Sequence, residues 1–90
     1  MNSMFQNASK LTKLDLSGWN TAKVSDSTSM FNNCVNLKTI YVGDGWNMDK
    51  VTVTTSSDMF KSCSQLPNYN ESVVDVRKAH AGEGGYLTKK

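Results

Sequence analysis

Few side chains in this sequence could carry catalysis. His80 is the only histidine among 90 residues, and no serine or aspartate stands at a recognisable spacing from it for a catalytic triad. The run Gly43-Asp44-Gly45 is too short and too poor in oxygen ligands to form a calcium loop. Neither glycine-rich run has a phosphate-binding lysine in place. We therefore expect no catalytic residue, no cofactor and no metal site.

The two cysteines, Cys34 and Cys63, lie too far apart to form a zinc site with a single histidine. They hold the same position in two copies of a repeat, and Ala8 holds that position in another copy. Because alanine is accepted at this position, a small buried side chain is what the position requires. This favours two buried cysteines whose thiols are free. The alternative is a disulfide between stacked units, although stacked equivalent positions rarely meet disulfide geometry.

The distribution of charged and apolar residues excludes two classes of partner, nucleic acid and the membrane interior. The formal net charge is +2, and the ten basic residues are scattered, so no basic stripe is available for nucleic acid. No apolar run is long enough to insert into a membrane, and no secretion leader begins the chain. We expect Lys89 and Lys90 to form a solvated tail. Because the chain begins in mid-repeat, we expect a fragment of a longer protein without its own signal or anchor.

A repeat organises the chain. One copy covers residues 4–24, a second covers 30–51, and a shorter third begins at residue 59. A period of this length is typical of a solenoid, in which each copy is one unit stacked on its neighbours. The matched positions are Met4-Phe5 with Met30-Phe31 and Met59-Phe60, Leu11 with Leu37 and Leu66, Leu14 with Ile40, Leu16 with Val42, and Trp19-Asn20 with Trp46-Asn47.

Each unit is predicted to begin with a short helix. Ser3, Ser29 and Asp58 precede the Met-Phe pair of their copies, and such side chains cap the first free N–H groups of a helix. Apolar residues then recur every third position, as from Phe31 to Leu37, which places them on one face. We predict a helix of about two turns in each copy.

Each helix is predicted to lead into a short strand. Residues 14–16 and 40–42 alternate in the manner of strands that stack in parallel, with Asp15 and Tyr41 facing outward. The predicted fold is α/β: a short leucine-rich-repeat solenoid of about two and a half repeats, each a short helix plus a short parallel β-strand, with a C-terminal capping segment.

The tryptophans Trp19 and Trp46 have two interpretations, a sugar-binding platform or core packing. Their matched places beside the strands favour core packing. The amides of Asn20 and Asn47 are expected to bond free backbone groups of neighbouring coils. The predicted interior comprises Phe5, Leu11, Leu14, Leu16, Trp19, Val24, Phe31, Cys34, Leu37, Ile40, Val42, Trp46, Val51, Phe60, Cys63 and Leu66.

The repeat pattern fails after residue 66. Pro67 interrupts the third unit, and the ends of repeat arrays are atypical because one side must face water. We therefore divide the chain into tandem repeats at 1–66 and a C-terminal capping segment at 67–90. Residues 71–79 are compatible with a short helix, although three valines there leave a strand as the alternative.

The repeat has a specific resemblance. Residues 30–47, MFNNCVNLKTIYVGDGWN, resemble the surface-protein repeat of BspA-type leucine-rich repeat proteins. Departures are Ala8 in place of a usual cysteine, and Ser27 and Ser56 where methionine is common. The resemblance covers nearly the whole chain and implies the C-terminal part of an array in an extracellular protein of a bacterial cell surface.

The resemblance implies a non-catalytic module for adhesion or protein–protein interaction, with a protein or glycan at a cell or matrix surface as partner. The side chains of a solenoid that face outward can vary without harming the stack. An alternative is a purely structural end-cap of a longer array with no ligand of its own, and a weaker one is part of a secreted enzyme. The candidate binding residues are Asp15, Ser17, Thr39, Tyr41 and Asp44.

The first unit has no preceding repeat. We expect its outer face to carry apolar side chains, with Met1, Met4, Phe5 and Trp19 as candidates, and its strand at 14–16 to be a sheet edge. Unpaired edges and apolar patches recruit partners. The sequence therefore predicts self-association through this end, by two-fold packing or by strand exchange.

Overall fold

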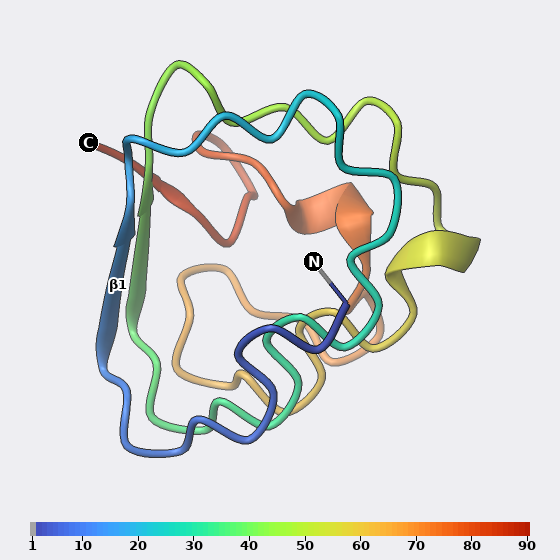
Figure 1. Ribbon diagram of the computed structural model, residues 1–90. Coiled ribbons are helices and arrows are strands. Elements are labelled where there is room, and N and C mark those ends of the chain that lie inside the picture. Colours follow the sequence, from blue (N-terminus) through green and yellow to red (C-terminus); the bar gives the residue numbers. More distant parts are fainter. Residues whose placement is uncertain (1) are drawn as a thin grey trace.

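The computed structural model describes residues 2–90 as a stack of coils (Figure 1). We call residues 2–28 the first coil, 29–57 the second coil, 58–66 the third coil and 67–90 the C-terminal segment. In Figure 1 the turns of these coils lie over one another, with the first coil in front. The regular elements are β1 (Lys13–Leu16), β2 (Thr39–Val42), the 3₁₀ turns η1 (Thr54–Ser56) and η2 (Val76–Lys78), and β3 (Thr88–Lys89).

A parallel sheet of three strands runs along one side of the stack, in the order β1-β2-β3. Leu14 pairs with Ile40 and Leu16 pairs with Val42, which confirms the register predicted from the repeat. The alternation of apolar and polar residues explains the pairing, because a slip of one residue would turn the apolar side chains out of the core.

The third strand comes from an unexpected place. It is supplied by the tail, since Thr88 of β3 pairs with Tyr41, and the Lys90 N–H donates to the carbonyl of Val42 at 3.0 Å. The expectation of a solvated tail at Lys89 and Lys90 is therefore wrong. The third coil contributes no strand within the described residues, because Pro67 follows it directly and lacks the N–H group that a ladder needs.

The predicted helices are wrong. Among residues 2–90 there is no α-helix, and the predicted N-caps Ser3, Ser29 and Asp58 have φ angles of 55°, 55° and 56°. These angles lie in the left-handed region, which a residue at a helix N-cap does not adopt. Asn7, Asn33 and Ser62 repeat this conformation four residues further on. Two left-handed residues in each copy prevent a helix from forming.

The hydrogen bonds of the backbone amides explain why no helix forms. In the second coil, the N–H groups of Asn32 and Cys34 bond carbonyls three residues back, as in 3₁₀ turns. The N–H groups of Ser29, Phe31 and Asn33 point the other way and donate to carbonyls of the next turn of the stack at 2.8–2.9 Å. Alternate amides thus join neighbouring coils, and a helix would have used them internally.

The core is a column of rings and aliphatic side chains inside the coils. The Phe5 and Phe31 rings stack with centroids 5.6 Å apart, and the Phe31 and Phe60 rings stack at 5.4 Å. The Tyr86 ring meets Phe60 edge-on at 5.3 Å. Ten of the predicted interior residues are buried: Leu16, Phe31, Cys34, Leu37, Ile40, Val42, Val51, Phe60, Cys63 and Leu66.

The other predicted interior residues are only partly buried: Phe5, Leu11, Leu14, Trp19, Val24 and Trp46. All but Trp46 belong to the first coil, whose outer side has no neighbour within residues 2–90. The sequence interpretation missed buried side chains at Met30, Met59, Ala79, Tyr86 and Leu87. Met1, a predicted member of the outer apolar face, lies outside the described residues.

The coils are also joined by polar side chains, but not by the asparagines that were expected. The Asn20 and Asn47 amide oxygens accept from the N–H groups of Ala22 and Asp49, two residues on. Such local Asx turns engage the amide oxygens within their own coil, and among the described residues no bond from either side chain to the neighbouring coil is present. Buried Thr21 makes the link instead, since its hydroxyl donates to the Asn47 carbonyl and accepts from the Asn47 N–H, at 2.9 and 2.6 Å.

The C-terminal segment covers the third coil. The Phe60 N–H donates to the Val74 carbonyl at 2.9 Å, and the Ser62 N–H donates to the Tyr69 hydroxyl at 3.1 Å. Residues 71–79 form neither the helix nor the strand considered from the sequence; they are irregular up to the single turn η2. Side chains supply part of their backbone hydrogen bonds, since the N–H groups of Ser72, Val76 and Arg77 donate to side-chain oxygens.

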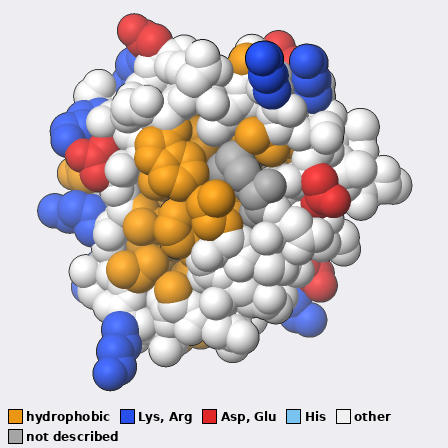
Figure 2. Space-filling view, in the orientation of Figure 1, with side chains coloured by type: hydrophobic (Ala, Val, Ile, Leu, Met, Phe, Trp, Pro, Cys, Tyr) orange, Lys and Arg blue, Asp and Glu red, His pale blue; other side chains and the backbone are white. Residues whose placement is uncertain are grey.

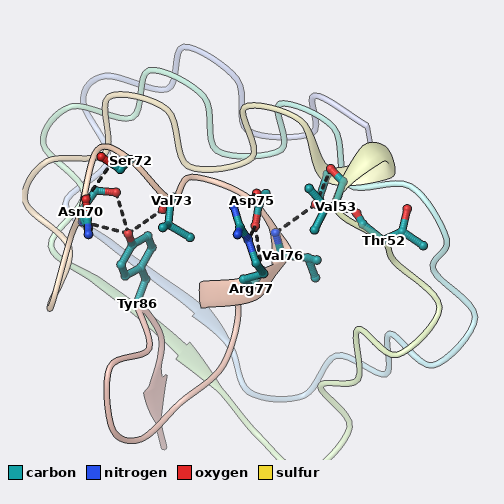
Figure 3. A network of polar contacts seen from close by, with 10 residues as sticks. Thr52, Val53, Asn70, Ser72, Val73, Asp75, Val76, Arg77 and Tyr86 are labelled. Carbon is teal, nitrogen blue, oxygen red and sulfur yellow. Dashed lines mark hydrogen bonds and ion pairs between the residues drawn. The ribbon is translucent and has the colours of Figure 1, made fainter.

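Figure 3 shows polar contacts of the C-terminal segment, among them those of Tyr86, Asp75 and Arg77. The Tyr86 hydroxyl accepts from the Asn70 N–H at 2.8 Å and lies 2.6 Å from the Val73 carbonyl, to which it donates. Asp75 accepts from the Arg77 backbone and guanidinium at 2.9–3.0 Å. One phenol therefore holds two points of this irregular segment, at Asn70 and Val73, over the core.

Candidate functional site

The outward side of the sheet gathers the binding residues predicted from the sequence. Asp15 of β1 lies opposite Tyr41 of β2, and Thr39 lies opposite Lys13. Thr88 of β3 continues the row beyond Tyr41. Because side chains alternate across a strand, these residues share the solvent side of the sheet.

The two remaining predicted residues lie beyond the carboxyl ends of the strands. The Ser17 N–H donates to the Asp15 carboxylate at 3.0 Å, and Asp44 follows β2 and pairs with Lys89. Gly43 lies directly against the first coil, since a β-carbon there would be 2.1 Å from the Ser17 carbonyl oxygen. The structure thus brings all five predicted residues to one region of the surface.

Tyr41 is the centre of this region. The ammonium nitrogens of Lys13 and Lys90 lie 6.0 and 5.8 Å from the centroid of its ring, within the range of cation–π attraction. Lys90 also pairs with Asp15. We call Lys13, Asp15, Tyr41 and Lys90 the sheet-face cluster. The sequence interpretation missed the two lysines. Lys13 directly precedes the predicted strand at 14–16, and Lys90 belongs to the tail, which carries no copy of the repeat.

The carboxylates of this region are held in the ionised form. The hydrogen bond from Lys90, with those from Ser17, holds the pKa of Asp15 well below its usual range. The hydrogen bond from Lys89 lowers the pKa of Asp44. Both carboxylates are exposed to water, which screens such pairs. Their effect is therefore to fix the charge pattern of the surface more than to stabilise the fold.

A groove of about 760 Å³ lies between the third coil and the C-terminal segment. Val35, Tyr69 and Val74 give it an apolar wall, and Asp58, Lys61 and Glu71 give it charges. The sequence interpretation missed this groove because one wall belongs to the irregular segment after Pro67. The only signal was Tyr69, an aromatic residue in a place where the repeat has an aliphatic one.

The single histidine is not assembled into a catalytic group. His80 is exposed, and its Nε2 lies 3.3 Å from the Glu83 carbonyl. The Trp46 indole N–H beside it donates to the Ala79 carbonyl at 3.0 Å, so this ring supports the C-terminal segment. Within residues 2–90 no three His, Cys, Asp or Glu side chains cluster in a way that could hold a metal ion.

The two cysteines are free and fully buried, which confirms the prediction of unpaired thiols. The Cys34 thiol donates to the Phe5 carbonyl at 3.1 Å, and the Cys63 thiol donates to the Phe31 carbonyl at 2.9 Å. The Cys34 sulfur and burial raise the pKa of Cys63. A buried neutral thiol such as that of Cys63 acts as a packing group and not as a nucleophile.

The described part of the chain holds no helix of the length and apolarity that crossing a membrane demands. A family model described as Mycoplasma protein of unknown function, DUF285, matches residues 1–81. No curated protein and no solved structure matches the chain.

Proposed function

This chain belongs to the DUF285 family, and we propose that it is a non-catalytic binding module of a bacterial cell-surface protein. The stack of coils, with a short parallel strand in each of the first two, is consistent with a leucine-rich-repeat arrangement, and the sequence of residues 30–47 resembles the BspA-type repeat. Modules of this architecture present an extended surface for recognition. Adhesion to a protein or glycan outside the cell is the role that we propose.

The observation that carries this proposal is the sheet-face cluster. Its aromatic ring has two ammonium nitrogens at 6.0 and 5.8 Å from its centroid, on the side of the sheet that takes no part in the core. A half-buried tyrosine at the surface supplies contact area at low entropic cost, and the lysines supply charge. Such a surface suits an extended peptide or a saccharide that carries carboxylate or sulfate groups.

A second function is favoured by the C-terminal segment, which covers the last coil with its own ring and hydrogen bonds. We propose, as the alternative, that the chain closes the end of a longer array and binds nothing itself. An enzymatic role has less support, because the His80 ring meets a backbone carbonyl, that of Glu83, and the Cys63 thiol donates to another, that of Phe31.

Binding arrays test these proposals. The purified chain is applied to immobilised matrix proteins, mucin and charged and neutral glycans, beside Tyr41→Ala and a control, Val53→Ala, which removes a 49% exposed apolar side chain elsewhere. We expect a signal that Tyr41→Ala reduces and Val53→Ala leaves unchanged. A binding signal that is the same for Tyr41→Ala as for the unchanged chain would overturn the sheet-face site. The absence of binding to every probe would favour the end-closing role.

A further inference from the structure

The C-terminal segment covers the third coil without replacing every bond that a further coil would make. Three alternate amides of the second coil, those of residues 29, 31 and 33, each donate to a carbonyl of the third coil at 2.8–2.9 Å. The repeat gives the third coil the same three amides, those of Asp58, Phe60 and Ser62. In the third coil their acceptors have to come from the C-terminal segment.

Only two of these three amides have an acceptor within residues 2–90. The Phe60 N–H donates to the Val74 carbonyl at 2.9 Å, and the Ser62 N–H donates to the Tyr69 hydroxyl at 3.1 Å. The Asp58 N–H has no acceptor among these residues. Its φ is 56°, and the equivalent residue of the second coil, whose N–H bonds the next coil, has a φ of 55°. The Asp58 N–H is therefore a strong donor that is available to a carbonyl of another molecule.

Asp58 lines the groove of about 760 Å³ between the third coil and the C-terminal segment. Ligand sites typically have volumes of about 300–1,000 Å³. Val35, Tyr69 and Val74 supply apolar contact area in the groove, and Val35 is 37% exposed. A backbone donor beside an apolar wall suits an extended peptide, because main-chain hydrogen bonds give affinity while apolar pockets receive side chains.

The charges around the groove select the kind of peptide. Asp58 and Glu71 bring two carboxylates, and Lys61 brings one ammonium group. Within residues 2–90 none of these three side chains makes an ion pair. The excess of negative charge favours a cationic side chain in the groove and disfavours an acidic one.

We propose that this groove binds an extended peptide segment that carries an arginine or lysine side chain. A carbonyl of the peptide accepts from the Asp58 N–H, and the cationic group pairs with the carboxylates of Asp58 and Glu71. A neighbouring apolar side chain of the peptide packs on Tyr69 and Val74. The groove shares no residue with the sheet-face cluster, so this second site does not rest on the function proposed for that cluster.

Amide NMR of the isotope-labelled chain tests the proposal. The probe is the blocked peptide acetyl-Ser-Val-Arg-Val-Ser-amide, titrated to millimolar concentration beside the same peptide with glutamate in place of arginine. We expect the arginine peptide to shift the Asp58 amide proton downfield, as a new hydrogen bond does, and to leave the signals of β1 and β2 unchanged. The glutamate peptide should bind at least about tenfold more weakly.

Substitutions at exposed charges sharpen the test. The double variant Asp58→Asn/Glu71→Gln removes both carboxylates, and asparagine tolerates the left-handed conformation at residue 58. We expect it to bind the arginine peptide about tenfold more weakly, because each exposed pair contributes up to about fivefold. Lys61→Gln removes a repelling charge and should bind the peptide about twofold more tightly. Glu83→Gln, the matched control, removes an exposed carboxylate outside the groove and should change nothing.

Another apolar surface has to be distinguished from the groove. Figure 2 shows an apolar patch on the side of the molecule where the first coil is nearest the viewer, and Met4 of that coil is 49% exposed. Met4→Ala should bind the arginine peptide as the unchanged chain does. Weaker binding by Met4→Ala would assign the peptide to the first coil and overturn the proposal.

Spectra of the free variants that stay close to that of the unchanged chain confirm that they fold. Four further results would overturn the proposal: no shift of the Asp58 signal at millimolar arginine peptide, equal affinity for the two peptides, full affinity in the double variant, or weaker binding by Lys61→Gln. The opposite signs expected at Glu71 and Lys61 separate a charge effect from a general loosening of the groove, which would weaken binding in both.

Discussion

The two ends of the stack are built on the same repeat and differ in what covers them. At the far end, Phe60 lies between Phe31 and the edge of Tyr86, and its N–H reaches Val74. At the near end, Phe5 has a stacked ring on one side only. Equivalent residues are therefore buried or half-exposed according to their neighbours. Burial in this molecule is a property of the stack and not of the repeat alone.

The largest expected difference concerns the aliphatic core. Leu37→Ala or Ile40→Ala should lower the free energy of unfolding by about 2–5 kcal/mol, because each leaves a cavity among fully buried neighbours. Leu11→Ala, at the position equivalent to Leu37 in the first coil, should cost about half as much or less. Urea unfolding followed by tryptophan fluorescence measures both. Equal losses at Leu11 and Leu37 would show that the first coil is covered after all.

The closed end should depend on one hydroxyl. Tyr86→Phe keeps the ring on Phe60 and leaves the backbone of Asn70 and Val73 without its partner, which should cost about 1–3 kcal/mol. Tyr41→Phe is the matched control, since no hydrogen bond is assigned to the Tyr41 hydroxyl among the described contacts, and it should cost almost nothing. Equal urea midpoints for the two variants would show that water replaces the Tyr86 hydroxyl.

The left-handed turns should cost the same in the first coil as in the second. Asn33→Ala places a less tolerant residue at φ 68°, and we expect a loss of about 1 kcal/mol. Asn33→Gly should be nearly neutral, because glycine adopts this conformation without strain. The same pair of changes at Asn7, where φ is 64°, should give similar values. A glycine variant as unstable as the alanine variant would assign the loss to the side-chain amide instead.

Acid should loosen the closed end slightly. The hydrogen bonds from Arg77 lower the pKa of Asp75 below its usual 3.8, so this carboxylate stabilises the fold above that value. The stabilisation is lost as the pH falls through the lowered pKa. We expect less than about 1 kcal/mol, because Arg77 is more than half exposed and water screens the pair. A urea midpoint that falls equally in Asp75→Asn between pH 5 and about pH 2 would contradict this.

The sequence predicted the parts of the fold that repeat. Matching Leu14 with Ile40 placed both strands and their register, because apolar alternation requires one side of a sheet to be buried. The same matching could have identified Met30 and Met59 as core residues, since a methionine recurs there in every copy.

The helices were predicted wrongly because apolar residues at every third position are also the pattern of successive 3₁₀ turns. What separates the two conformations is the destination of alternate amides, and that depends on the neighbouring coil. Ser29 and Asn33 could serve as a cap and a helical residue as readily as they serve at positive φ. Local preference therefore did not decide between helix and turn.

The candidate site was predicted in part. Asp15 and Tyr41 followed from strand alternation, but the lysines around the ring did not. Lys90 reaches Tyr41 only because the tail returns as a third strand, and a non-repeating segment leaves no period from which its path can be read. The wall of the groove at Tyr69 and Val74 was missed for the same reason.

The alternating turns have a practical consequence for spectroscopy. Strands of four, four and two residues and coils that mix left- and right-handed residues offer little coherent backbone signal to far-ultraviolet circular dichroism. The intact protein should give a spectrum close to that of a disordered chain, and heating should change it little. The near-ultraviolet circular dichroism bands of the packed rings of Phe31, Phe60 and Tyr86 should disappear on heating. In this protein the aromatic column, and not the amide backbone, reports optically whether the chain is folded.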